Sequence, residues 1–199
     1  MKTAFCFDMD GTITKLEILP LLSREIGIEP EMAVLTKATI DGILPFDQSF
    51  RLRTRLLAEI PIQQVQSIIK NALLHTKIVD FIQENLENCY IVTGNLDIWI
   101  EKLIQKIGCN FYSAKADYKG DKLIGLKSSL NKSEAIKDLK NKGYARIVVI
   151  GDGMNDVPMF EIADIKIAFG GVHHPVLSLI KLSNYVIYRY NNGSLISTD

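Results

Sequence analysis

Residues 4–12 read AFCFDMDGT, a short apolar run followed directly by two acidic residues. Two later stretches repeat this pattern: an apolar run at 90–92 precedes Thr-Gly-Asn, and one at 147–150 precedes Gly-Asp-Gly-Met-Asn-Asp. Continuous apolar runs, unlike alternating ones, are typical of strands buried on both faces of a parallel sheet. The three runs therefore predict parallel strands, and their polar clusters are expected to meet at one edge of the sheet.

Helical patterns separate these runs. Apolar residues recur at helical spacing over residues 76–87, 96–107 and 133–142, and further apolar runs at 165–169 and 185–188 predict two more strands. Strands that alternate with helices form βαβ units, in which the helices cover both faces of the sheet. We therefore predict an α/β fold, a three-layer α/β/α arrangement around a parallel sheet.

The stretch 15–75 interrupts the alternation. Its apolar spacing and its Gly and Pro breaks predict four helices, near residues 16–26, 31–40, 46–58 and 62–74. Because a parallel crossover needs only one helix, we interpret residues 15–75 as an inserted helical cap and residues 1–14 and 76–199 as the α/β core. We also predict a short hairpin at 118–125 and a frayed polar tail from Asn191 onward.

Composition narrows the classes of function. The 199 residues include 23 Lys+Arg and 23 Asp+Glu, so a formal net charge of zero argues against nucleic-acid binding and against a polybasic membrane anchor. No apolar run approaches the length of about 18 residues needed to cross a bilayer, and the N-terminus does not resemble a signal peptide. Cys6, Cys89 and Cys109 are scattered, which indicates reduced packing residues and a cytoplasmic location.

The acidic residues after the strands suggest a metal site. Asp8 and Asp10 follow the first strand, and Asp152 and Asp156 follow the third. Burying such carboxylates together is costly unless a cation or hydrogen bonds offset their repulsion. Oxygen ligands with few neutralising cations favour Mg²⁺. The alternative is that these residues are ordinary turn formers, because Asp-Gly is a common turn.

Two further features suggest an anion site. Thr93, Gly94 and Asn95 follow a strand and are predicted to open a helix, where a hydroxyl and free backbone N–H groups can bind an anion. Lys132 precedes the next helix, at the end of the helix dipole that is unfavourable for a cation, so an anion is expected to face it. The simpler alternatives are helix capping by Thr93 or Asn95 and an exposed Lys132.

Taken in order, these clusters resemble the four signature motifs of the haloacid dehalogenase superfamily. They are Asp8-Met9-Asp10-Gly11-Thr12, Thr93-Gly94-Asn95, Lys132 and Gly151-Asp152-Gly153-Met154-Asn155-Asp156. The helical insert after the first motif resembles the cap of the phosphoserine phosphatase branch. The resemblance implies the Rossmannoid fold of that superfamily and a Mg²⁺-dependent hydrolysis of phosphomonoesters through an aspartyl-phosphate.

The resemblance also implies roles for individual residues. Asp8 would be the nucleophile and Asp10 the general acid and base. The metal ligands would be Asp8, the backbone carbonyl of Asp10, and Asp152. Lys132 would contact the phosphoryl oxygens, and the remaining residues implied at the phosphate side are Thr93, Gly94, Asn95 and Asn155, with Asp156 orienting Lys132 or a metal-bound water.

The cap is expected to choose the substrate. Glu17 and Arg53 match the positions that, in phosphoserine phosphatases, contact the substrate ammonium and carboxylate, and Phe46 would be an apolar wall. The alternative is that Arg53 belongs to one solvated face with Arg51 and Arg55. Gly11 and Asn95 depart from the residues usual in that branch, which leaves other substrates open.

We therefore predict a phosphatase for O-phosphoserine or a similar phosphorylated amino acid. Sugar, polyol and nucleotide phosphates, phosphoryl transfer to an alcohol such as homoserine, and a non-catalytic binding module remain alternatives. The partner is a small molecule, with no nucleic acid and no membrane, and no oligomeric state is predicted. His173 and His174, which precede Pro175, are assigned a loop role only.

Overall fold

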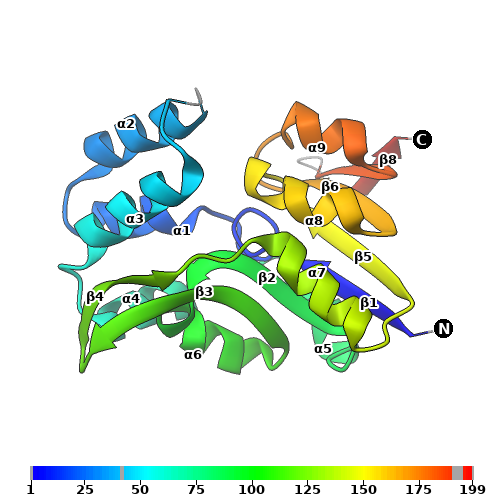
Figure 1. The fold of residues 1–199 in the computed structure, drawn as a ribbon, viewed down its shortest axis with the longest axis horizontal. Helices are drawn as coiled ribbons and strands as arrows, with labels where there is room; N and C mark the ends of the chain where they lie inside the picture. The colour runs from blue at the N-terminus through cyan, green and yellow to red at the C-terminus, as the bar shows by residue number, and fades with distance from the viewer. Residues whose placement is uncertain (1, 41–42, 190–194, 199) are drawn as a thin grey trace.

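The computed structural model describes residues 2–40, 43–189 and 195–198, which contain an eight-stranded sheet (Figure 1). The strand order is β4-β3-β2-β1-β5-β6-β7-β8. The strands are β1 (Thr3–Phe7), β2 (Cys89–Leu96), β3 (Asn110–Lys119), β4 (Lys122–Ser128), β5 (Arg146–Gly151), β6 (Ile165–Gly170), β7 (Tyr185–Arg189) and β8 (Leu195–Thr198). β4 and β8 are antiparallel to their neighbours, and the strands between them are parallel.

Helices cover both faces of the sheet. α5 (Thr76–Glu84) and α6 (Asp97–Ile107) share one hydrophobic core with the sheet, in which Trp99 packs with Ile91. α7 (Lys132–Asn141), α8 (Val157–Ile162) and α9 (Leu177–Leu182) form a second core, in which Phe160 packs with Val149. Adjacent residues of each central strand thus face different cores, as in the pair Ile91 and Val92. The predicted three-layer α/β/α fold is confirmed.

The insert contains the four helices expected from the sequence. They are α1 (Ile18–Arg24), α2 (Glu29–Ile40), α3 (Phe46–Leu57) and α4 (Ile62–Lys70). Figure 1 shows α2 and α3 on the left, far from α8 and α9 on the right. The two chain segments that enter and leave the insert pair with each other, because Thr14 and Leu74 form an antiparallel bridge and the His75 N–H donates to the Ile13 carbonyl at 2.9 Å. The division into core and cap stays a prediction.

α4 is bonded to the α/β part of the chain at its start and at its middle. The Gln66 amide donates to the Ile98 carbonyl at 2.8 Å and to the Glu101 carboxylate at 3.1 Å, both on α6. The Ile62 N–H donates to the carbonyl of Asp121, in the β3–β4 turn, at 3.0 Å. The last helix of the insert is therefore joined to α6 and to the β3–β4 hairpin.

Three local predictions were incomplete. β3 was not expected as a strand beside β2, and the hairpin around Gly120 is longer than the predicted 118–125. β2 continues through Thr93-Gly94-Asn95 to Leu96, with a shift of register, so these residues do not open the helix, which begins at Asp97. Residues 195–198 form β8 where a frayed tail was expected, and residues 191–194 and 199 lie outside the described part of the chain.

Two predictions from composition can be compared with the structure. Cys6, Cys89 and Cys109 are free and buried, in agreement with their predicted packing role. In the described ranges, we find no helix that combines the length and the apolar character needed to span a membrane.

Because the parallel strands are buried, we can predict how much stability the protein loses when a cavity is made in its core. Ile91 lies on central β2 and is fully buried, so Ile91→Ala is expected to lower the free energy of unfolding by about 2–5 kcal/mol. Ile124→Ala on β4 removes the same atoms from a side chain that is 56% exposed, and its cost should stay below about 1 kcal/mol. Urea denaturation followed by circular dichroism measures both changes. Equal losses would contradict the assignment of β2 to the core.

Candidate active site

The candidate site lies where the three central strands end. β1 is flanked by β2 and β5, and the order of connections reverses at β1, the place where open α/β sheets bind ligands. Asp8 follows β1, and its N–H donates to the Ile150 carbonyl on β5 at 2.8 Å. Thr93 lies on β2 and Asp152 follows β5. The sheet therefore brings together the clusters that the sequence pattern placed at one edge.

A buried ammonium joins the first and last clusters. The Nζ of Lys132, the first residue of α7, donates to Oδ1 of Asp8 and, at 2.6 Å, to Oδ1 of Asp156. The second oxygen of Asp156 accepts the N–H groups of Asp152 and Gly153, each at 3.0 Å. Lys132, Asp8, Asp152 and Asp156 are all buried. Asp156 thus holds both Lys132 and the loop that carries Asp152.

The buried charges shift one another's pKa values. Burial first, and then the charge of Asp156, raises the pKa of Asp8 well above its ordinary value, while Lys132 opposes the rise. Burial and Asp156 likewise raise the pKa of Asp152 to about 7. Burial alone would lower the pKa of Lys132, but Asp156 and Asp8 outweigh it and raise that pKa. One ammonium does not offset this many carboxylates, so the cluster favours a further cation.

Two of the three predicted Mg²⁺ ligands, Asp8 and Asp152, lie together with Asp156. Each of these three residues places one carboxylate oxygen within 4.8 Å of the others. These are oxygen donors, which Mg²⁺ prefers. Gly11 has φ of +71°, and a Cβ there would collide with Oδ2 of Asp152. Gly11 therefore leaves the space in which the Asp152 carboxylate lies.

Asp10 is held separately from this cluster. Its Oδ1 accepts the N–H of Ile18 at 2.8 Å, and its Oδ2 accepts the side-chain amide of Asn95 at 2.6 Å. Burial, followed by the charge of Glu17, raises the pKa of Asp10 to about 7, although the bonds from Ile18 and Asn95 oppose the rise. A carboxyl group with a pKa near 7 can both donate and accept a proton at neutral pH.

Asn95 has a contact that the sequence did not predict. We expected its side chain beside the phosphate pocket, but it bonds to Asp10 and to Oγ1 of Thr93, the latter at 3.0 Å. Because Thr93 and Asn95 are two residues apart on the irregular end of β2, their side chains reach the same side of the strand end. Asn155 lies in the loop of Asp152, with its side-chain oxygen beside Gly153.

The cap residues approach the site from α3 and from the segment before α1. The Phe46 ring lies against Gly94, 3.9 Å from where a Cβ would be, and stacks on Phe50 with ring centroids 6.1 Å apart. Arg53 lines a pocket of about 560 Å³ between α1, α2 and α3. Its Nε is buried without a hydrogen-bond partner. Burial lowers the pKa of Arg53, while the nearby charge of Glu17 opposes this.

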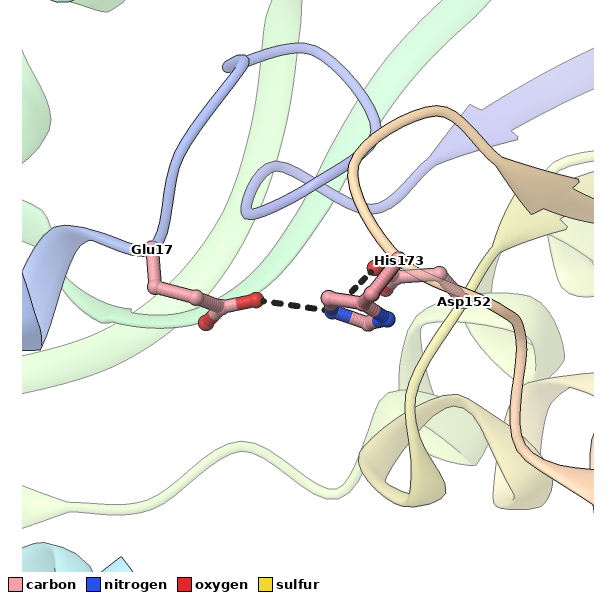
Figure 2. A group of neighbouring side chains, drawn as sticks. All are labelled: Glu17, Asp152 and His173. Carbon is pink, nitrogen blue, oxygen red and sulfur yellow. Dashed lines mark hydrogen bonds and ion pairs between the residues drawn. The ribbon is translucent and has the colours of Figure 1, made fainter. Parts of the chain in front are cut away.

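His173 is the residue that sequence reasoning missed. We assigned it a loop role only, but its Nε2 lies 3.3 Å from Oε1 of Glu17 and 3.1 Å from Oδ2 of Asp152 (Figure 2). The hydrogen bond to Glu17 is the main reason that the pKa of His173 rises to about 9. Glu17 and His173 are 156 residues apart, and no sequence motif joins them.

Comparisons with known proteins agree with this geometry. A family model described as haloacid dehalogenase-like hydrolase matches residues 5–161. A curated phosphoserine phosphatase of Methanocaldococcus jannaschii is 32% identical over 180 residues, which cover 84% of this chain and 85% of that protein. The phosphoserine phosphatase of Homo sapiens is 27% identical over 184 residues, which cover 84% of this chain and 81% of that protein.

Solved structures of similar proteins have the same fold. A substrate-bound phosphoserine phosphatase complex matches with a TM-score of 0.78 and 28% identity, over 95% of this chain and 94% of that one. A phospho-aspartyl intermediate analogue of phosphoserine phosphatase matches with a TM-score of 0.76 and 29% identity, over 96% of this chain and 95% of that one. The predicted family resemblance is confirmed.

The position of Gly11 yields a test of the metal site. Gly11→Ala and Gly120→Ala both place a side chain at positive φ, so each is expected to cost about 1–2 kcal/mol of stability. Only the Gly11 variant collides with Asp152, since nothing lies within 4 Å at Gly120. We expect Mg²⁺ affinity, measured by isothermal titration calorimetry, to fall by about 10-fold or more in Gly11→Ala alone. Unchanged affinity in that variant would remove Asp152 from the metal site.

Proposed function

We propose that this chain, which belongs to the haloacid dehalogenase-like hydrolase family, hydrolyses O-phosphoserine or a closely similar phosphorylated amino acid. The observation that carries the proposal is the pairing of two differently held carboxyl groups, Asp8 bonded to buried Lys132 and Asp10 bonded to Asn95. Two carboxyl groups in different environments can divide nucleophilic attack and proton transfer between them.

In the first step, a carboxylate oxygen of Asp8 attacks the phosphorus atom, and the bond from phosphorus to the ester oxygen breaks. The proton on Asp10 passes to the leaving alcohol, which departs neutral. This step requires Asp8 ionised and Asp10 protonated. Burial opposes the first state, while the contact from Lys132 favours it and a bound dication would favour it further; a pKa of about 7 makes the second state accessible near neutral pH.

In the second step, water attacks the phosphorus of the aspartyl-phosphate. Asp10, now ionised, accepts a proton from that water, and the bond from phosphorus to the Asp8 oxygen breaks. Phosphate leaves, Asp8 is again a carboxylate and Asp10 again carries its proton. Asn95 holds one Asp10 oxygen throughout, so the group that gives the proton is positioned to take one back.

Lys132, Thr93 and the Gly94 N–H contact the phosphoryl oxygens and offset their negative charge. Asp8, Asp152 and the Asp10 carbonyl would hold Mg²⁺, whose positive charge, when it is bound, would offset the repulsion between carboxylate and phosphate. Asp156 positions Lys132 through its 2.6 Å contact and positions Asp152 through that residue's N–H. Asn155, in the same loop as Asp152, contributes a side-chain amide to the phosphate side of the site.

The amino-acid part of the substrate is assigned to Glu17, Arg53 and Phe46. Arg53 has a buried Nε with no hydrogen-bond partner, which suits it to donate to a substrate carboxylate. The charges of Glu17 and Arg53 are opposite, and this pair would suit a group that carries both an ammonium and a carboxylate. Phe46 covers Gly94 and provides the apolar wall.

The partner in this proposal is a small phosphomonoester, and a cytoplasmic location belongs to the same proposal. Three buried free thiols are compatible with a reducing compartment. Because its formal net charge is zero, the chain lacks the surplus of positive charge that nucleic-acid binding relies on.

The nucleophile can be tested directly. Asp8→Asn replaces the attacking carboxylate with a neutral amide, and we expect Mg²⁺-dependent phosphate release from O-phosphoserine to fall by about 10⁴-fold or more. Asp80→Asn makes the same chemical change at an exposed position of α5 and should leave the rate unchanged. Substantial turnover by the Asp8 variant would rule out the aspartyl-phosphate route.

Recognition of the substrate carboxylate gives a second test. We expect Arg53→Ala to lower kcat/KM for O-phosphoserine by about 100-fold, since a desolvated charge pair is lost. For p-nitrophenyl phosphate, which has no carboxylate, the change should stay within about threefold. Arg55→Ala, on the same helix but exposed, serves as the control and should affect neither substrate. If the two substrates lose activity equally in the Arg53 variant, the assigned contact is wrong.

A further inference from the structure

Three side chains from distant parts of the chain converge beside the proposed active site. Glu17 precedes α1, Asp152 follows β5 and His173 lies between β6 and α9. Figure 2 shows the His173 ring between the two carboxylates. One oxygen of each acid and one nitrogen of the ring all lie within 4.8 Å of one another. The group combines an imidazole with two negative charges.

The hydrogen bonds leave one buried oxygen of this group without a donor. The Nδ1 of His173 lies 3.2 Å from the His174 carbonyl, so it is suited to carry a proton and leave Nε2 to face Glu17 and Asp152. A single proton on Nε2 can point at only one oxygen, and the hydrogen bond goes to Glu17. Oδ2 of Asp152 is buried and accepts no hydrogen bond, although Asp152 is only 3% exposed. The protonated ring of His173 therefore offsets part of the charge of the two carboxylates without donating to Oδ2 of Asp152, whereas a metal ion that replaced the proton on Nε2 would contact all three atoms.

Two of the three separations between donor atoms are close to the edges of a metal coordination shell, and the third is below 4.8 Å. Zinc binds imidazole nitrogen and carboxylate oxygen at about 2.0–2.2 Å, which places tetrahedral donor atoms about 3.3–3.6 Å apart. The Nε2 of His173 lies 3.3 Å from Glu17 and 3.1 Å from Asp152. The contact between Nδ1 and the His174 carbonyl is the support that metal-bound histidines usually have.

We propose that Glu17, Asp152 and His173 form a binding site for a transition-metal dication of the Zn²⁺ class. It differs in kind from the oxygen-only Mg²⁺ site, because imidazole favours zinc and its neighbours in the transition series over magnesium. The two carboxylates balance the charge of a dication. Three protein ligands leave a fourth position for water. The two sites have Asp152 in common.

Occupancy of this site has a consequence for substrate binding, and this step rests on the proposed function. A metal that binds Glu17 occupies the carboxylate assigned to the substrate ammonium. It also ties the segment before α1 to the loop after β5. Bound Zn²⁺ therefore inhibits hydrolysis of O-phosphoserine, and removal of His173 relieves that inhibition.

The test measures metal binding without turnover, so its result does not depend on the proposed reaction. Metal-free protein is titrated with Co²⁺, whose visible absorption is strong in four-coordinate sites that include nitrogen and weak in six-coordinate oxygen sites. We expect the wild-type protein to develop the strong band at one equivalent, and Zn²⁺ to abolish it. His173→Ala should lose the band and bind Co²⁺ at least about 10-fold more weakly.

The neighbouring histidine provides the matched control. His174→Ala removes an imidazole whose ring packs against Tyr188, and it should keep the band and the affinity of the wild type. Circular dichroism establishes that both variants are folded. The proposal is overturned if the wild type shows no strong band, or if His173→Ala retains the band and the affinity.

Discussion

The ammonium of Lys132 lies between the carboxylates of Asp8 and Asp156, and all three side chains are withdrawn from solvent. Taking such charges out of water is expensive, and an ion pair of this kind does little for stability beyond repaying its own desolvation. Removing one partner would leave an uncompensated buried charge, so the three residues depend on one another. Their contribution is to fix the relative positions of β1, α7 and the loop after β5, because the ammonium of Lys132 on α7 contacts Asp8 after β1 and Asp156 in that loop.

The same constraint explains why the two aspartates of the first motif differ. Asp8 faces Lys132, while Asp10 faces the Asn95 amide and the N–H of Ile18. Ile18 is the first residue of α1, so the insert begins by holding the carboxyl group assigned to proton transfer. One hydrogen bond of 2.8 Å therefore joins Ile18, at the start of the insert, to Asp10, which is assigned to proton transfer.

Continuous apolar runs made the central strands predictable, and motif order made Asp8, Lys132 and Asp152 predictable as neighbours. β3 was not predicted because the central strands were recognised by continuous apolar runs, whereas its residues alternate between polar and apolar, as in a strand that is only partly covered. The extension of β2 through Asn95 escaped because small polar residues after an apolar run usually end a strand. The contacts of His173 were not predicted for another reason. They join it to Glu17 and Asp152 through the packing of loops, which leaves no pattern in the spacing of the sequence.

The bonds that hold α4 limit how the insert can open. Gln66 is bonded to α6 and Ile62 to the β3–β4 turn, and Arg51 on α3 donates to the Leu126 carbonyl on β4 at 3.3 Å. A rigid swing of residues 15–75 would have to break all of these bonds, whereas a tilt of α1–α3 alone would keep the α4 bonds and break only the one from Arg51. Such a tilt would turn about the short connection 58–61 between α3 and α4, where the fixed φ of Pro61, the residue before α4, limits the backbone.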